Sequence, residues 1–254
     1  MSDASLTEVT FPVGTKHLGE WAFSKCKNLK SVTFEGKFVP GMFERGVFEG
    51  CDRLEKITFD GFDEDTPVLL AAAVSKLKVM HLLTADDVGE KSWYEKWDLA
   101  LKMCLLADDA EGSIAAALCG EEDISYDGIG SVDGEMPGET SEFVKNAAMN
   151  KCSLCYLRLI YDSFLREETK EIICNYLRGR AFGKGEGYSW MTLKEVSGDS
   201  LAYYETYLEV IKPDRDTLGG MIEDLDSNLV AVKSFLIKQT KVSGDDLLNG
   251  LFFG

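Results

Sequence analysis

The sequence predicts an α+β protein with a small parallel sheet in its first quarter and a larger all-helical domain after it. A short strand-like unit recurs near the N-terminus at a nearly constant spacing, which is typical of stacked repeats. After residue 61, alternating apolar residues give way to helical spacing. The 254 residues are 45 % hydrophobic, which is enough for one large domain or two ordinary domains with real cores.

The repeated unit is clearest between residues 22 and 61. The segment LKSVTFEG at 29–36 recurs 25 residues later as LEKITFDG at 54–61, with every apolar position kept. At the same shift, AFSKC at 22–26 corresponds to VFEGC at 47–51. A third copy, LTEVTF at 6–11, precedes the LKSVTF strand by 23 residues. Each copy therefore supplies one strand, and stacking the copies predicts a parallel sheet.

Each predicted strand alternates apolar and polar residues, which places them on opposite faces of the sheet. The residues expected to point inward, with the three Phe rings in one buried column, are Val9, Phe11, Val32, Phe34, Ile57 and Phe59. The candidate partner contacts, which are expected to line the open face, are Glu8, Thr10, Ser31, Thr33, Lys56 and Thr58. Strand propensity also favours threonine on a merely solvated face, so solvation without binding remains an alternative for these residues.

The residues around the first strands form a recognisable motif. The run LTEVTFP at 6–12, followed by LGEWAF at 18–23 and CKNL at 26–29, resembles the BspA-type leucine-rich repeat of bacterial and protozoan proteins. The resemblance covers residues 1–61. It implies a short solenoid whose strand face binds other proteins, in a family often displayed on cell surfaces, and it implies no catalysis. Three copies are few, so either the helical part acts as a cap or the chain is a fragment of something longer.

An acidic linker at 63–65 precedes Thr66, a candidate N-cap, and Pro67, which suits the first helical position. The predicted boundary near 62 separates a repeat domain at 1–61 from a helical domain at 62–254. Helices are expected at 67–83, 92–107, 110–119, 141–150, 153–178 with a break near Arg166, 199–212, 216–226, 228–240 and from Asp245 onward. A faint likeness between the segments ending NYLR and KSFL leaves a helical-repeat arrangement open.

The net charge is −17, from 27 basic and 44 acidic residues. Such a charge repels phosphate backbones and anionic lipid surfaces, so neither nucleic acid nor membrane insertion is expected. The N-terminal segment has no basic and apolar leader pattern, so a cytoplasmic location is expected, with the cell surface or secretion as the alternative if a signal peptide was removed. Reduced, buried thiols are expected at Cys104, Cys119, Cys152, Cys155 and Cys174.

Several motifs are weighed as chemical sites, and each is better explained structurally. The segment 123–131 matches the first half of a calcium loop, but Gly134 stands where a bidentate Glu is required, which favours an acidic Gly-rich loop at 120–140. The Gly183–Gly187 run has no following Lys-Ser or Lys-Thr, so we expect a turn. Cys152 and Cys155 have no second pair for zinc. His17 lies in a repeat turn, and His81 is expected to be partly buried on a helix.

No catalytic residue, cofactor or metal site is therefore predicted. The favoured function is a non-catalytic scaffold that binds a protein of unknown identity through the open sheet face, the helical domain or both. Two alternatives stay open. One is a divergent enzyme with its site in the helical domain, and the other is a calcium-modulated binding module.

Overall fold

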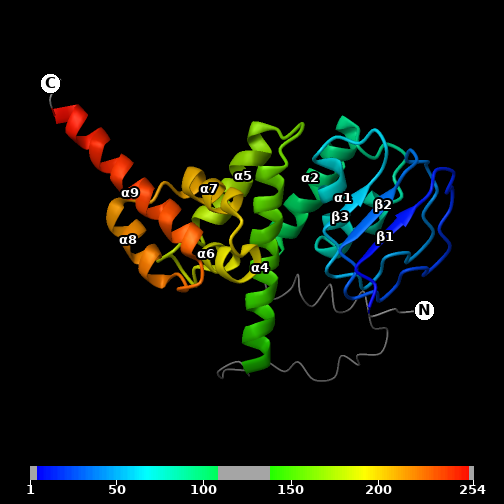
Figure 1. Ribbon diagram of the computed structural model, residues 1–254, viewed down its shortest axis with the longest axis horizontal. Coiled ribbons are helices and arrows are strands. Elements are labelled where there is room, and N and C mark those ends of the chain that lie inside the picture. Colours follow the sequence, from blue (N-terminus) through cyan, green and yellow to red (C-terminus); the bar gives the residue numbers. More distant parts are fainter. Residues whose placement is uncertain (1–4, 108–137, 252–254) are drawn as a thin grey trace. The chain divides into compact units, whose positions relative to one another are not determined.

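The structure is a computed structural model that describes residues 5–107 and 138–251 (Figure 1). The chain divides into two compact units. Unit 1 comprises Met1–Ala147 and Leu157–Lys170, and unit 2 comprises Ala148–Tyr156 and Glu171–Gly254. The repeats and the first helices thus share one unit, and the domain boundary near residue 62 stays a prediction.

The N-terminal part of unit 1 contains a three-stranded parallel sheet in the order β1-β2-β3. The strands are β1 (Glu8–Phe11), β2 (Ser31–Phe34) and β3 (Lys56–Thr58). Their register aligns equivalent positions of the copies, so that Phe11 lies opposite Phe34. The small parallel sheet predicted from the repeat is confirmed.

The predicted column of phenylalanine rings is also present. The ring centroids of Phe11 and Phe34 lie 4.7 Å apart, and those of Phe34 and Phe59 lie 4.3 Å apart, with both pairs stacked. These spacings follow from the register, because neighbouring strands lie about 4.7–4.9 Å apart. Phe34 and Phe59 are buried, whereas Phe11 at the open end of the column is half-buried.

A second line of buried side chains runs beside this column and includes Cys26 and Cys51, which occupy the same position in successive copies. The Cys51 thiol donates to the Phe23 carbonyl at 3.0 Å, and burial raises the pKa of Cys51 to about 11. Both thiols therefore belong to the core, and Cys51 is a poor nucleophile at neutral pH.

The other predicted thiol positions differ in their burial. Cys152, Cys155 and Cys174 are buried, as expected. Cys104 is only half-buried, so full burial was wrong there, and Cys119 lies outside the described residues. The cellular redox state of these thiols stays a prediction.

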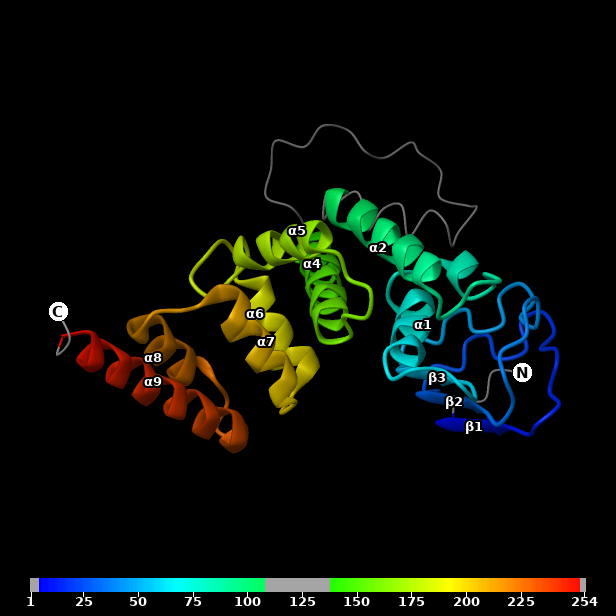
Figure 2. The ribbon, with the colours of Figure 1, turned by 90° about the horizontal axis from the view of Figure 1, so that it is seen from above.

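Helix α1 (Thr66–Ser75) follows the sheet and packs beside β3 (Figures 1 and 2). Pro67 lies in its first turn, as predicted, but Thr66 is not the N-cap. Instead the Asp63 carboxylate accepts from the Thr66 amide at 2.7 Å, while the Thr66 hydroxyl is buried against the Tyr94 hydroxyl at 2.9 Å. The Thr66 hydroxyl therefore does not cap the helix, because it bonds to Tyr94, 28 residues further along the chain.

Helix α1 ends earlier than expected because Lys78 adopts a left-handed backbone, with φ of 59°, and a separate 3-10 turn, η1 (Met80–Leu82), follows. Helix α2 (Lys91–Leu106) matches its prediction, and the helix expected at 110–119 lies outside the described residues. Helix α4 (Gly138–Ile160) runs through the interruption expected near 151, whereas the break near Arg166 before α5 (Glu167–Arg178) is confirmed.

Unit 2 continues with helices that were partly predicted. The elements are α6 (Tyr188–Thr192), η2 (Leu193–Ser197), α7 (Leu201–Ile211), α8 (Arg215–Asp224) and α9 (Val230–Leu251). The sequence did not predict α6 and η2, because five residues are too few to show a helical period. The separate terminal helix from Asp245 was wrong, because α9 continues through that residue.

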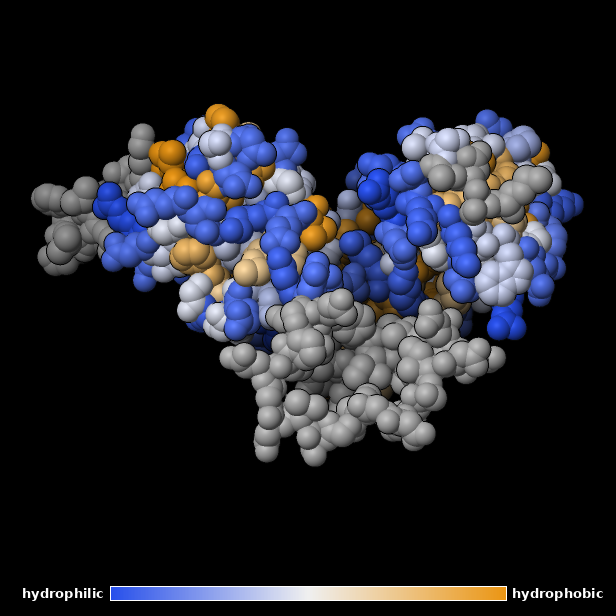
Figure 3. Space-filling view, turned by 90° about the horizontal axis from the view of Figure 1, so that it is seen from below, coloured by the Kyte–Doolittle hydropathy of each residue, from blue (hydrophilic) through white to orange (hydrophobic). Residues whose placement is uncertain are grey.

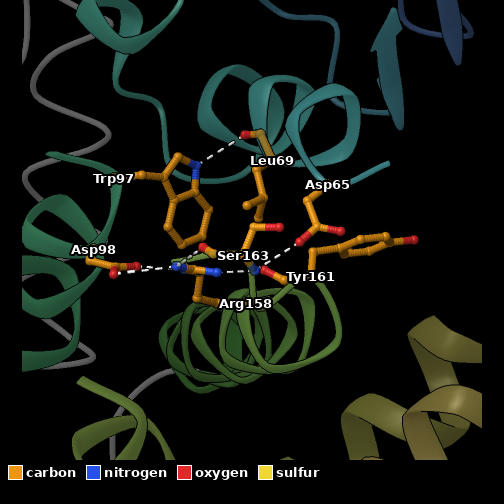
Figure 4. A network of polar contacts seen from close by, with 7 residues as sticks. All are labelled: Asp65, Leu69, Trp97, Asp98, Arg158, Tyr161 and Ser163. Carbon is orange, nitrogen blue, oxygen red and sulfur yellow. Dashed lines mark hydrogen bonds and ion pairs between the residues drawn. The ribbon is translucent and has the colours of Figure 1, made fainter. Parts of the chain in front are cut away.

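A buried polar network holds the helices of unit 1 together (Figure 4). Arg158 is fully buried, and its Nε donates to the Asp98 carboxylate of α2 at 2.6 Å. Its two terminal nitrogens donate to the carbonyls of Tyr161 and Ser163, which lie just beyond the end of α4. The Ser163 amide in turn donates to the Asp65 carboxylate at 2.8 Å. One guanidinium therefore joins α2 to the α4–α5 connection.

Loss of the Asp63 carboxylate should weaken the start of α1. We expect Asp63→Ala to lower the free energy of unfolding of unit 1 by about 1 kcal/mol, as for other N-terminal helix caps, because the Thr66 amide loses its acceptor. Asp63→Asn keeps one acceptor oxygen and should cost less. Urea denaturation at neutral pH measures both variants, and an Ala variant as stable as wild type would contradict the capping role.

The same residue makes a pH-dependent contribution. Partial burial opposes ionisation, but hydrogen bonds from Thr66 and Tyr94 outweigh it and lower the pKa of Asp63. A depressed folded-state pKa means that the stabilisation is complete above the unfolded-state pKa of about 3.9 and is lost as the pH falls through the folded-state value. The stability difference between wild type and Asp63→Asn should therefore shrink below about pH 4.

Candidate functional site

The open face of the sheet presents two rows of polar side chains. One row crosses the strands as Glu8, Ser31 and Lys56. The second row is Thr10, Thr33 and Thr58. Glu8, Thr10 and Lys56 are exposed, and the other three are half-buried. The structure thus brings all six predicted contact residues together on one face, which we call the sheet face.

The chemistry of the sheet face is that of recognition by hydrogen bonds. Four of its six side chains are hydroxyls, which both donate and accept. Glu8 and Lys56 stand at opposite ends of one row, separated by two strand spacings of about 4.8 Å each. Neither forms an ion pair with a described residue, so both charges are available to a partner. The threonine side chains are stiff at χ1, which limits the entropy that binding would cost.

The two histidines lie apart from this face. His17 pairs with Glu44, with Nε2 and Oε1 3.1 Å apart, and both side chains are about half exposed. His81 is exposed in η1, so the expectation that it would be partly buried on a helix was wrong. The short turn at Met80–Leu82 leaves its ring outside the core. Among residues 5–107 and 138–251, neither histidine contacts a thiol, as a cysteine nucleophile would require.

The Gly183–Gly187 run forms a turn, as expected, with left-handed backbone at its three glycines. It borders a small groove of about 220 Å³ in unit 2, whose ionisable lining includes Lys194 and Asp224. Asp224 accepts from Trp190 Nε1 at 2.6 Å and from Lys194 Nζ at 2.7 Å. Asp224 and Lys194 therefore pair with each other, and these contacts stabilise the fold.

Calcium or other metal binding and membrane insertion are further possibilities that the sequence bears on. The candidate calcium loop at 123–134 lies outside the described residues. Within residues 5–107 and 138–251, no group of three acidic, histidine or cysteine side chains is placed to hold a metal ion. None of the helices in those ranges is both long and apolar enough to cross a lipid bilayer.

Polar side chains cover most of the face seen in Figure 3, and apolar side chains appear there in small patches. This distribution agrees with the net charge of −17, which favours solvation of the surface. Sequence periodicity found the sheet face because its rows repeat at the spacing of the copies. Periodicity does not predict a groove in unit 1 at the carboxyl ends of β2 and β3, because three separate segments line it and none carries a motif.

The comparisons with known proteins agree with the repeat. Residues 1–67 match the sequence model of a family described as "BspA type Leucine rich repeat region (6 copies)", and this region is therefore a BspA-type leucine-rich repeat. No curated protein and no solved structure matched the chain. Leucine-rich repeats generally mediate protein–protein interaction, and the match thus supports that broad class of function for the N-terminal region.

Proposed function

We propose that this chain is a non-catalytic protein-interaction scaffold in which the N-terminal repeats form a short solenoid. The supporting observation is the sheet face, where two rows of hydroxyl and charged side chains cross a parallel sheet inside the region that matches the repeat family. A protein partner suits this face because its side chains offer both donors and acceptors without a strong charge of one sign. Helix α1 of the same unit packs against β3 and supports the stack.

Helix α1 covers one end of the repeat stack and helps to hold it rigid. Helix α1 packs against β3, and the Ser75 hydroxyl donates to the Leu54 carbonyl at 2.9 Å. This end of the apolar stack is therefore covered by protein. We propose that α1 serves as the cap that a short solenoid needs, because terminal repeats expose apolar surface unless something covers them.

The test is affinity capture from an extract of the native host, with the wild-type chain and a Thr33→Arg variant. Thr33 is central on the sheet face, between Thr10 and Thr58. A bulky charge there should reduce the retained partner about tenfold or more, as expected for the centre of an interface. Quantitative mass spectrometry of the retained proteins measures the effect.

The matched control is Ser234→Arg, which adds the same charge at an exposed position of α9. Its captured proteins should equal those of wild type. Thermal unfolding of both variants checks that the fold is kept. If Thr33→Arg retains the same proteins in the same amounts as wild type, the sheet face is not the binding surface.

A further inference from the structure

A groove with a volume of about 460 Å³ lies in unit 1 at the carboxyl ends of β2 and β3. Residues that follow β2 (Lys37, Phe38) and residues that follow β3 (Asp60, Phe62) line it together. They meet because the strands are parallel and adjacent, so their carboxyl ends share one edge of the sheet. The volume falls within the range of about 300–1,000 Å³ typical of ligand sites.

Two aromatic rings form an apolar lining of this groove. The centroids of Phe38 and Phe62 lie 6.1 Å apart, and both side chains are half-buried. Each ring also packs against the buried Phe59, at 5.3 Å and 5.1 Å respectively. The lining is therefore an extension of the phenylalanine column, which holds the two rings in place.

The turn before α2 provides the third wall. Gly89 has φ of +86°, a conformation that other residues rarely adopt. A Cβ at this position would lie 3.4 Å from Thr66 Oγ1 and 3.8 Å from a ring carbon of Phe62. A Cβ would thus fit at these distances, and it is the left-handed backbone that calls for glycine in the turn carrying Asp86 and Glu90 to the groove.

The rim of the groove is acidic. Asp60, Asp86 and Glu90 are exposed and make no ion pair or side-chain hydrogen bond with a described residue. Asp63 is also acidic, but its oxygens accept from Thr66 and Tyr94. Lys37 is the one basic residue among the described residues that line the groove. Three uncommitted carboxylates therefore surround an aromatic lining.

We propose that this groove binds an arginine or lysine side chain of a protein partner. A cation gains from the face of an aromatic ring within about 6 Å, and carboxylates around it add charge-assisted hydrogen bonds. An anionic ligand would meet the acidic rim, and a wholly apolar one would desolvate the carboxylates without pairing them. The proposal goes beyond the protein-binding role of the sheet face, since it concerns a different surface and states the chemistry of the ligand.

The probe is a blocked pentapeptide, acetyl-Gly-Ser-Arg-Ser-Gly-amide, titrated into the ¹⁵N-labelled full chain. Versions with lysine or with neutral citrulline in place of arginine separate guanidinium, ammonium and shape. We expect the amide resonances of Gly61 and Gly89 to shift, with an affinity of about millimolar for arginine, as for a few weak contacts. Citrulline should bind about tenfold more weakly, because it lacks the charge.

Two matched triple variants test the carboxylates. Asp60→Asn, Asp86→Asn and Glu90→Gln together remove three charges from the rim, and the arginine peptide should then bind about tenfold more weakly. The control removes three exposed charges from α7 and α8 through Glu205→Gln, Glu209→Gln and Glu223→Gln, and it should bind like wild type.

The aromatic lining is tested by Phe62→Leu, which keeps an apolar side chain but removes the ring. Arginine affinity should fall about two- to fivefold, the loss of one exposed cation–π contact. If Phe62→Leu is misfolded, the triple variant that removes the rim carboxylates still tests the proposal. Equal weakening by both triple variants would show general attraction to an acidic surface and overturn the proposal, as would equal binding of citrulline or unmoved Gly61 and Gly89 resonances.

The sheet-face variant Thr33→Arg separates this proposal from the proposed function. It should bind the arginine peptide as wild type does, because Thr33 does not line the groove. Loss of partner capture with peptide binding intact would support both surfaces. Failure of one measurement therefore leaves the other interpretable.

Discussion

Arg158→Ala is expected to lower the free energy of unfolding of unit 1 by about 3–5 kcal/mol, the range for breaking a buried ion pair. The variant leaves the Asp98 carboxylate buried without its cation, because the guanidinium lies 2.6 Å away in a fully buried setting. It also removes the donors to the Tyr161 and Ser163 carbonyls. Urea denaturation followed by tryptophan fluorescence measures the change, since Trp97 lies in the same network (Figure 4).

The matched control is Arg166→Ala, which breaks the exposed ion pair with Glu95. Solvent screens such pairs, so the expected cost is about 0–1 kcal/mol. Hydrogen exchange should assign the difference between the two variants to α2 and to the connection between α4 and α5. If the two arginine variants are equally stable, the buried network does not hold unit 1 together.

Phe34→Ala is expected to cost about 3–5 kcal/mol, the range for truncating a buried aromatic core residue. Phe34 is 3 % exposed and stacks between Phe11 and Phe59, so its removal leaves a cavity in the middle of the column. Chemical denaturation measures the loss, and near-ultraviolet circular dichroism should show disturbed aromatic packing.

Phe11→Ala is the comparison within the same column. Phe11 is half-buried at the end of the stack, so water can fill part of the space that its ring leaves. The cost should be clearly smaller than for Phe34→Ala. A larger loss at Phe11 than at Phe34 would contradict the order of the rings in the column.

Local repetition explains why much of unit 1 was predictable. In each copy the V-x-F or I-x-F pattern specifies a strand, and the constant shift of 23 to 25 residues specifies which residues lie opposite one another. The outward rows follow from the same alternation, so the residues of the sheet face can be predicted from the sequence. Its role in binding a partner stays a prediction.

Helix limits were less predictable because they depend on distant partners. The N-cap residue is Asp65 rather than Thr66, because the Thr66 hydroxyl bonds to Tyr94 and the Thr66 amide donates to Asp63. Helix α1 stops at Ser75, and the chain then turns through the left-handed backbone of Lys78. Apolar periodicity alone extended this helix further, since it does not register such contacts.

The strands, their parallel pairing, the phenylalanine column and the outward rows could be predicted from the sequence, because each depends on a short pattern repeated at a fixed spacing. The pairing of Arg158 with Asp98, which lie 60 residues apart, could not. The same holds for the acidic groove, whose walls come from three segments that share no motif. Such contacts depend on how whole elements pack, and local periodicity carries no information about that packing.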